Sequence, residues 1–83
     1  MIYGLYAIKD AKTTFMPCTV DYNDASAIRN FEHAVQSPDS LMRSHPNDYA
    51  LFKVGTFNNE NGAIEHSFAP ILLCDASDVL KGE

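Results

Sequence analysis

The stretch Ala27-Ile28-Arg29-Asn30-Phe31-Glu32-His33-Ala34-Val35, followed by Tyr49-Ala50-Leu51-Phe52-Lys53-Val54-Gly55, decides the fold of this 83-residue chain. In the first part, apolar residues recur every three or four positions, which predicts one face of an amphipathic helix. Asn23 is a favourable N-cap residue and an acidic residue follows it, so we expect a helix over Asp24 to Gln36. The second part is rich in β-branched and aromatic residues and predicts a strand.

Further strands are expected on both sides of this helix. The pattern predicts four in all: Ile2 to Ile8, Thr13 to Met16, Tyr49 to Phe57 and Ala63 to Phe68. Pro17 removes a hydrogen-bond donor, so the second strand should end there or lie at an edge. The segment from Asn58 to Gly62 predicts a hairpin turn, with glycine where positive φ is needed.

Two proline-containing segments predict short elements outside the four strands. Ser37 followed by Pro38 is typical of a helix start, and we expect a single turn there that packs Leu41 and Met42. Pro70 interrupts the chain after the fourth strand. It leaves a separate apolar run before a last helical turn, in which Asp75 is the expected cap.

These elements predict an α+β domain. We expect an antiparallel sheet, in the chain order β-β-α-β-β, with one long helix packed on one face and a short C-terminal turn. A chain of this length forms one domain, residues 1–83. Ile28 and Phe31 are predicted to be among the most buried residues.

The bulk composition limits the class of protein. Eleven acidic residues against six Lys and Arg give a formal net charge of −5, which weighs against strong electrostatic binding of nucleic acid. Cys18 and Cys74 are too few for a disulfide scaffold, and no signal peptide precedes the first strand. No apolar run is long enough for a transmembrane helix. We therefore expect a cytoplasmic protein with reduced thiols and no membrane association.

Catalytic and metal-binding patterns are not found in the sequence. The three histidines and two cysteines are isolated, whereas zinc ligands usually come in close pairs. Ser44-His45 with Asp48 is the one local cluster that resembles a nucleophile with its base, and adjacent loop residues rarely reach each other in that geometry. We expect no enzyme activity, no cofactor and no metal.

Several aromatic residues fall on the predicted strands, and three lysines lie on or beside these strands. Such a combination holds single-stranded nucleic acid, because bases stack on aromatic rings while cations follow the phosphates. The residues of this pattern are Lys9, Lys12 and Lys53 for phosphate, with Tyr3, Tyr6 and Tyr49 as stacking faces. The alternative is that Phe15, Phe31, Phe52 and one face of the tyrosines form the core.

The chain also resembles a known family over about residues 2–75. The segments that carry the resemblance recur in order: Tyr3-Gly4-Leu5-Tyr6, Lys9-Asp10-Ala11-Lys12, the helix from Ala27 to Val35, Ser40-Leu41-Met42 to Ser44-His45-Pro46, Asp48-Tyr49-Ala50-Leu51-Phe52 to Gly55, the Gly62 turn and Pro70-Ile71-Leu72-Leu73. They are similar to the small nonstructural protein of gokushoviruses, which are single-stranded DNA phages of the Microviridae.

This resemblance implies a phage accessory protein in the cytoplasm of the infected bacterial host. Members are described as nonstructural or DNA-binding, and a role in single-stranded DNA replication or packaging follows. The alternative is an interaction module whose acidic surface, with Glu60, Glu65 and Asp75, binds a host replication factor or another phage protein. We also expect a homodimer, because the apolar segment Ile71-Leu72-Leu73 has no evident place in a four-stranded sheet covered by one helix.

Overall fold

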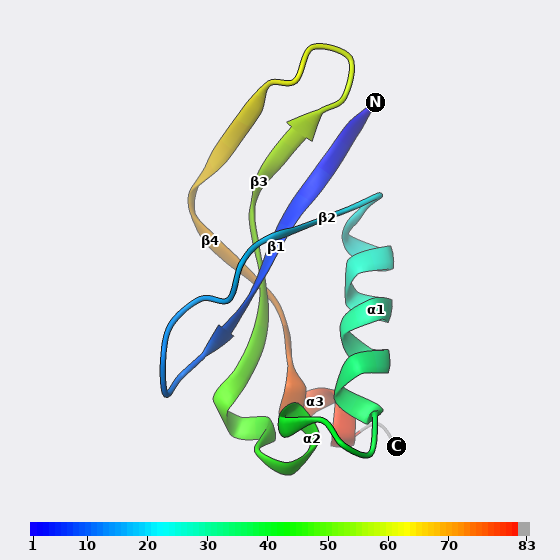
Figure 1. The fold of residues 1–83 in the computed structure, drawn as a ribbon, viewed down its shortest axis with the longest axis vertical. Coiled ribbons are helices and arrows are strands. Elements are labelled where there is room, and N and C mark those ends of the chain that lie inside the picture. The colour runs from blue at the N-terminus through cyan, green and yellow to red at the C-terminus, as the bar shows by residue number, and fades with distance from the viewer. Residues whose placement is uncertain (82–83) are drawn as a thin grey trace.

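In a computed structural model, the long helix α1 (Asp24–Gln36) lies against one face of a four-stranded antiparallel sheet (Figure 1). The structure describes residues 1–81, and at Phe68 it describes the backbone alone. The strands lie in the order β2-β1-β3-β4. Two short helices and a 3₁₀ turn gather at the C-terminal end of α1. The remaining elements are β1 (Ile2–Asp10), β2 (Thr19–Asp21), α2 (Leu41–Ser44), η1 (Pro46–Asp48), β3 (Tyr49–Asn58), β4 (Ile64–Asp75) and α3 (Ala76–Lys81). The predicted fold class and the chain order β-β-α-β-β are confirmed.

Helix α1 has the predicted bounds, and its start is capped as expected. The side chain of Asn23 accepts a hydrogen bond from the backbone N–H of Ser26 at 2.8 Å, which satisfies one of the free donors of the first turn. The residues that the helix buries are Ala27, Phe31 and Val35, at the spacing of one helical face. The apolar pattern of the sequence therefore fixes the orientation of the helix.

The core lies between α1, the sheet and α3. Its buried members are Tyr6, Ala27, Phe31, Val35, Leu51, Ala76 and Val79. Phe31 is among them, as predicted. Ile28 is only half-buried at the margin of this cluster, so the prediction for Ile28 is wrong. Ala27 takes the central position instead, because its small side chain lets the helix lie close to the sheet.

The second strand differs from the prediction. Residues Thr13 to Met16 form no strand, and their contact with β1 is a single bridge between Lys9 and Phe15. The strand lies after Pro17, where Thr19 and Val20 are β-branched and pair with β1. The apolar residues before Pro17 predicted a strand, but Phe15 packs against the ring of Phe52 and does not form a strand with β1.

The β3–β4 hairpin closes through the predicted turn. Gly62 has a φ of 76°, a conformation that glycine adopts without strain. β4 then continues through Pro70 as an edge strand, and the run after Pro70 is its second half. The prediction of a separate segment is therefore wrong. Proline is tolerated because the register shifts between Lys53 and Gly55, which leaves the residues around Pro70 outside the ladder.

The turn before β3 begins later than predicted. The side chain of Ser40, rather than that of Ser37, accepts the backbone N–H of Met42 and caps α2. Met42 packs against the core, whereas Leu41 remains 64% exposed. The Ser-Pro pattern predicted a helix start three residues too early.

Replacement of Phe31 by alanine tests the core. The side chain is 3% exposed, so we expect the variant to lose about 3–5 kcal/mol of unfolding free energy, most of the stability of a small domain. Ile64→Ala is the control, since Ile64 is 68% exposed. Thermal unfolding followed by circular dichroism measures both. A Phe31→Ala protein that melts within a few degrees of the parent would contradict this core.

Candidate nucleic-acid interface

The sheet has one face against α1 and one face turned away from it, here called the outer face. Side chains alternate along a strand, and the hydroxyl of Tyr6 reaches Asp24 at the start of α1. The side chains of β1 that point to the outer face are therefore Tyr3, Leu5, Ala7 and Lys9. The register adds neighbours from the other strands: Val20 opposite Leu5, Phe52 opposite Ala7, Phe57 opposite Tyr3, Ile64 opposite Phe57 and Leu72 opposite Phe52.

One aromatic pair with a cation lies on the outer face near the end of β1, where Phe15 lies opposite Lys9 and Phe52 opposite Ala7. The rings of Phe15 and Phe52 meet edge to face with centroids 5.5 Å apart and planes at 76°. The Nζ of Lys9 lies 5.6 Å from the centroid of Phe15, within the range of a cation–π contact. Phe15 is 37% exposed, so part of its ring is open to solvent. The sequence left open the alternative that both phenylalanines lie in the core, and neither belongs to it.

A second aromatic pair lies at the other end of the same face. The rings of Tyr3 and Tyr22 are 5.8 Å apart and tilted by 58°. The hydroxyl of Tyr3 accepts a hydrogen bond from the side-chain amide of Asn59 at 3.3 Å. Tyr22 is 65% exposed. Phe52 lies opposite Ala7 and Phe15 opposite Lys9, four and six positions after Tyr3, so the two pairs are about 13–20 Å apart along β1.

Tyr6 does not belong to this surface. It is 1% exposed in the core, and its hydroxyl donates to Asp24 Oδ1 at 2.6 Å. A side chain added at Gly4 would collide with the hydroxyl and ring of Tyr6, so glycine makes room for this contact. Burial, with the adjacent Asp24 carboxylate, raises the pKa of Tyr6 well above its usual value. The prediction that Tyr6 stacks a base is therefore contradicted.

Lys53 lies on the helix side and already has a partner. Its Nζ is 3.1 Å from Asp24 Oδ1, the same oxygen that accepts from Tyr6. The hydrogen bond from Tyr6, followed by Lys53, lowers the pKa of the Asp24 carboxyl below its ordinary value. Lys53 therefore joins β3 to α1, and its predicted contact with phosphate does not fit this position.

Tyr49 and Lys12 complete the predicted set. Tyr49 is half-buried beside Asp10, and desolvation, followed by the Asp10 carboxylate, raises its pKa. Anionic neighbours disfavour an approaching phosphate, so Tyr49 is a poor stacking position. Lys12 is exposed in the turn after β1, where its backbone N–H donates to Asp10 Oδ1 at 2.9 Å. Of the six predicted residues, Lys9 and Tyr3 point to the outer face, and Lys12 lies in the turn that follows β1.

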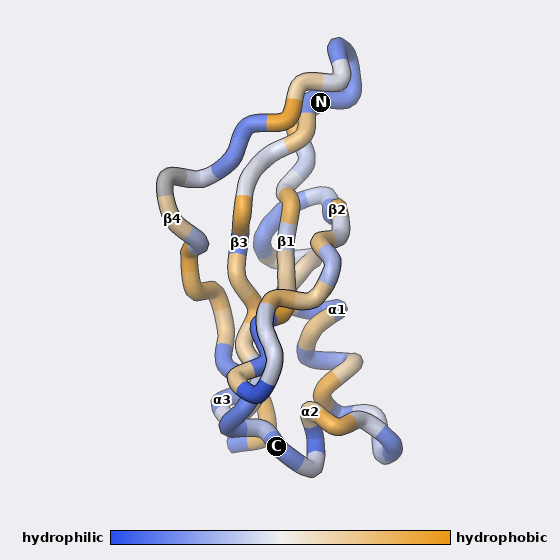
Figure 2. Tube along the Cα trace, turned by 60° about the vertical axis from the view of Figure 1, so that its left-hand side comes forward, coloured by the Kyte–Doolittle hydropathy of each residue, from blue (hydrophilic) through white to orange (hydrophobic). Residues whose placement is uncertain are grey.

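The three predicted dimer residues lie on the second half of β4, which Figure 2 colours as hydrophobic. Ile71 and Leu72 are 51% and 52% exposed, on opposite faces of this edge strand. Leu73 packs against the core of its own chain. Glu60 lies in the hairpin turn at one end of β4 and Asp75 at the other, so the acidic residues of the alternative hypothesis do not form one cluster.

The side chains of Ser44 and His45 reach each other, contrary to what is expected of adjacent loop residues. Ser44 Oγ lies 2.8 Å from His45 Nδ1, and the same hydroxyl lies 3.2 Å from the carbonyl of Leu41. Both side chains are exposed, and α2 ends where the backbone N–H of His45 donates to the carbonyl of Leu41. Within residues 1–81, no three or more His, Cys, Asp or Glu residues are grouped so that they could hold a metal ion. None of the helices in this range is long and apolar enough to cross a membrane.

Substitution of Asp24 tests the link between sheet and helix through its pH dependence. The folded-state pKa of Asp24 is lowered, so its stabilising effect is present above the unfolded value of about 4 and is lost as pH falls through the folded value. We expect Asp24→Asn to cost about 1 kcal/mol at about pH 7, and the difference from the parent to shrink at about pH 3. Urea unfolding measures both. The exposed Asp39, changed to Asn, is the control, and a difference that grows toward acid pH would contradict the assignment.

The comparisons with known proteins agree with the phage resemblance. A family model described as Phage ORF5 protein matches residues 3–79, from the first strand to the last helix. No curated protein and no solved structure matches the chain. The match covers nearly all of the chain, so this protein belongs to the Phage ORF5 protein family.

Proposed function

We propose that this phage protein is the small nonstructural protein of a gokushovirus, a member of the Microviridae, and that it binds single-stranded DNA weakly during genome replication or packaging. It acts in the cytoplasm of the infected bacterial host, by binding rather than by catalysis. Membership of the Phage ORF5 family supports a phage accessory protein, and the sequence resemblance supports the narrower group.

The arrangement of the outer face is the observation that supports DNA as the ligand. A four-stranded antiparallel sheet, with its helix on the far side, presents two aromatic pairs and a lysine on one surface. Aromatic side chains on such a sheet stack unpaired bases, and this stacking tolerates any sequence because every base has a π-face. The two pairs, Phe15 with Phe52 and Tyr3 with Tyr22, provide two stacking positions along β1.

The charge of the chain sets the strength of this binding. With Lys53 paired to Asp24, only Lys9 and Lys12 of the predicted cations are placed to meet phosphate near the outer face. The net charge of −5 opposes them at long range. Binding therefore depends on stacking more than on charge, and it should be weak and only moderately sensitive to salt.

The salt dependence of binding to a labelled single-stranded oligonucleotide tests this proposal. Two phosphate contacts predict a log–log slope of about −1.4, or about −2.8 for a dimer. Lys9→Ala with Lys12→Ala should bring the slope close to zero. Arg29→Ala with Lys81→Ala removes the same charge from exposed sites on α1 and α3 and should leave the slope unchanged.

A ring substitution separates stacking from charge in the same assay. Phe15→Ala should weaken binding by about 1–3 kcal/mol without changing the slope, because the ring contacts bases and not phosphates. Absence of binding by the parent at low salt and tens of micromolar protein would refute the DNA proposal. It would leave the protein-binding alternative, in which an acidic surface recruits a host replication factor or another phage protein.

We also propose that the protein is a homodimer joined along β4. The chain exposes 5494 Å² against about 4900 Å² for a compact monomer of 9.2 kDa, an excess close to what one partner of a small dimer buries. The two copies pair only along the part of β4 that follows Pro70, which contains Ile71 and Leu72. Before Pro70, the register shift interrupts the regular pairing of β4 with β3. A two-fold axis through this edge places both outer faces on the same side.

Light scattering on the eluting protein tests the dimer. The parent should have about twice the mass of 9.2 kDa at micromolar concentration. Leu72→Lys should give monomers by placing a charge at the contact, while Ile64→Lys, at the other end of the same strand, should not. A parent that elutes with the mass of one chain would exclude the dimer.

A further inference from the structure

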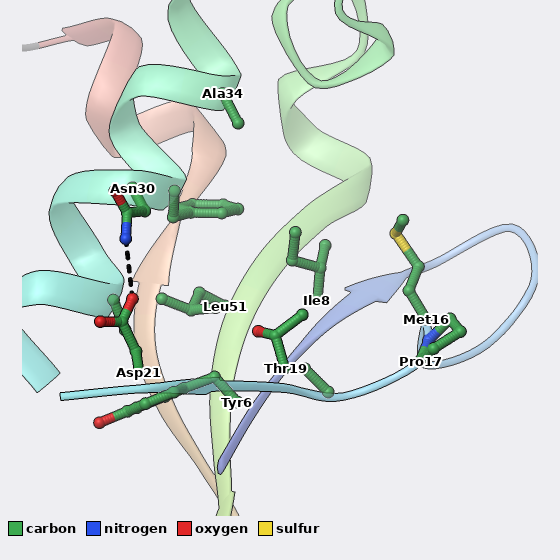
Figure 3. A pocket seen from close by; sticks show the side chains of 12 residues that line it. Tyr6, Ile8, Met16, Pro17, Thr19, Asp21, Asn30, Ala34 and Leu51 are labelled. Carbon is green, nitrogen blue, oxygen red and sulfur yellow. Dashed lines mark hydrogen bonds between the residues drawn. The ribbon is translucent and has the colours of Figure 1, made fainter. Parts of the chain in front are cut away.

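A cleft opens on the helix side of the sheet, at a distance from the outer face. It has a volume of about 220 Å³ and lies between α1, the inner face of β1 and β3, and the segment that leads into β2 (Figure 3). Its floor is apolar, with Ile8, Phe31 and Leu51. Met16 and Pro17 form the wall opposite α1. A cavity of about 150 Å³ accommodates benzene, so this one accommodates a single large apolar side chain.

The fold explains why this cleft stays open. α1 presents the small side chains of Ala27 and Ala34 to it, so the helix leaves space where larger residues would fill the groove. β2 has only three residues, and the chain before it forms a loop instead of a paired strand. Phe15 turns to the outer face while Met16 turns to the cleft, so this loop contributes to both surfaces.

A second hollow adjoins the cleft at Met16. This hollow has a volume of about 410 Å³ and shares Met16 with the first. Its apolar walls come from Leu41, Met42 and Tyr49. Met16 is 45% exposed and Leu41 is 64% exposed, which leaves an apolar groove in contact with water. Methionine side chains adapt their shape to different partners, which is typical of protein-docking grooves.

The charges along the groove have one sign. Asp21 lines the first hollow and Asp10 lines the second, while neither hollow is lined by Lys or Arg. Asp21 is held in place by the side-chain amide of Asn30, which donates to its Oδ2 at 2.8 Å. Hydrogen bonds, with Ser26 the largest contributor, lower the pKa of Asp21, so the carboxylate stays charged. An apolar groove with a carboxylate in each hollow is complementary to a basic, apolar segment.

We propose that this groove binds a basic segment of another protein, which places one apolar anchor side chain in each hollow and cations beside Asp21 and Asp10. A second copy of the chain supplies no such basic segment, because its six Lys and Arg, at positions 9, 12, 29, 43, 53 and 81, are dispersed along the sequence. The site is separate from the outer face and does not depend on DNA binding. It gives the protein-binding alternative a location that includes none of Glu60, Glu65 and Asp75.

A synthetic amphipathic peptide of leucine and lysine is the probe, with a leucine and glutamate peptide of the same apolar pattern as its control. Calorimetry or fluorescence anisotropy should show binding of the lysine peptide alone. Ala34→Phe fills the first hollow and should weaken this binding about tenfold or more. Thr19→Phe, at an exposed position on the opposite wall, is a second filling variant should the first fail to fold.

Charge and location are tested in the same titration. Asp21→Asn and Asp10→Asn should each weaken lysine-peptide binding several-fold, whereas the exposed Asp39→Asn should not. Tyr3→Ala, which alters the outer face and lines neither hollow, should leave peptide binding unchanged, so this proposal and the DNA proposal can fail separately. Equal binding of both peptides, unchanged binding by the filling variants, or no binding at all would overturn the proposal. If the Ala34→Phe variant no longer formed the homodimer, the groove would be assigned to a second copy of the chain. That result would also overturn the proposal.

Discussion

The carboxylate of Asp24 is the point on which the arrangement of this domain depends. It accepts the buried hydroxyl of Tyr6 from β1 and lies 3.1 Å from the ammonium of Lys53 on β3, so the first residue of α1 is tied to both central strands. Gly4 leaves the space that this contact requires. Among residues 1–81, a core of seven buried residues is a modest source of stability, so a directional contact at the start of the helix has a large influence on where the helix lies.

Because α1 is tied to one face, the two sides of the sheet have different roles. The outer face has no helix to cover it, and its aromatic residues remain partly in water. The helix side is closed along β3 and open beside β1, where small helix residues and a short β2 leave a groove. One surface is suited to flat aromatic ligands such as bases, and the other to apolar side chains accompanied by positive charge. The two proposals therefore concern different surfaces of the same domain.

Local signals predicted much of this fold. The helix bounds, its Asn23 cap, β3 and the Gly62 turn all follow from short-range patterns, and the structure confirms them. Tertiary contacts were harder to predict. Tyr6 and Lys53 looked like a stacking face and a phosphate ligand, but the position of Asp24 turns both toward the helix. Phe15 looked like a strand residue and packs on Phe52 from a loop. Pro70 predicted the end of a strand, but β4 continues beyond it because the register of pairing with β3 shifts there. Each of these depends on a partner distant in sequence, which no local pattern shows.

Photo-crosslinking with an oligonucleotide that contains bromodeoxyuridine tests the central claim most directly, because it locates the bound base on the protein. Irradiation of the complex, digestion and mass spectrometry identify the crosslinked residues. The structure predicts crosslinks at Phe15 and Phe52 and at Tyr3 and Tyr22, with none on Tyr6 or along α1. Crosslinks confined to α1 or to the groove beside it, or a protein that remains uncrosslinked at saturating oligonucleotide, would contradict the assignment of the outer face to single-stranded DNA.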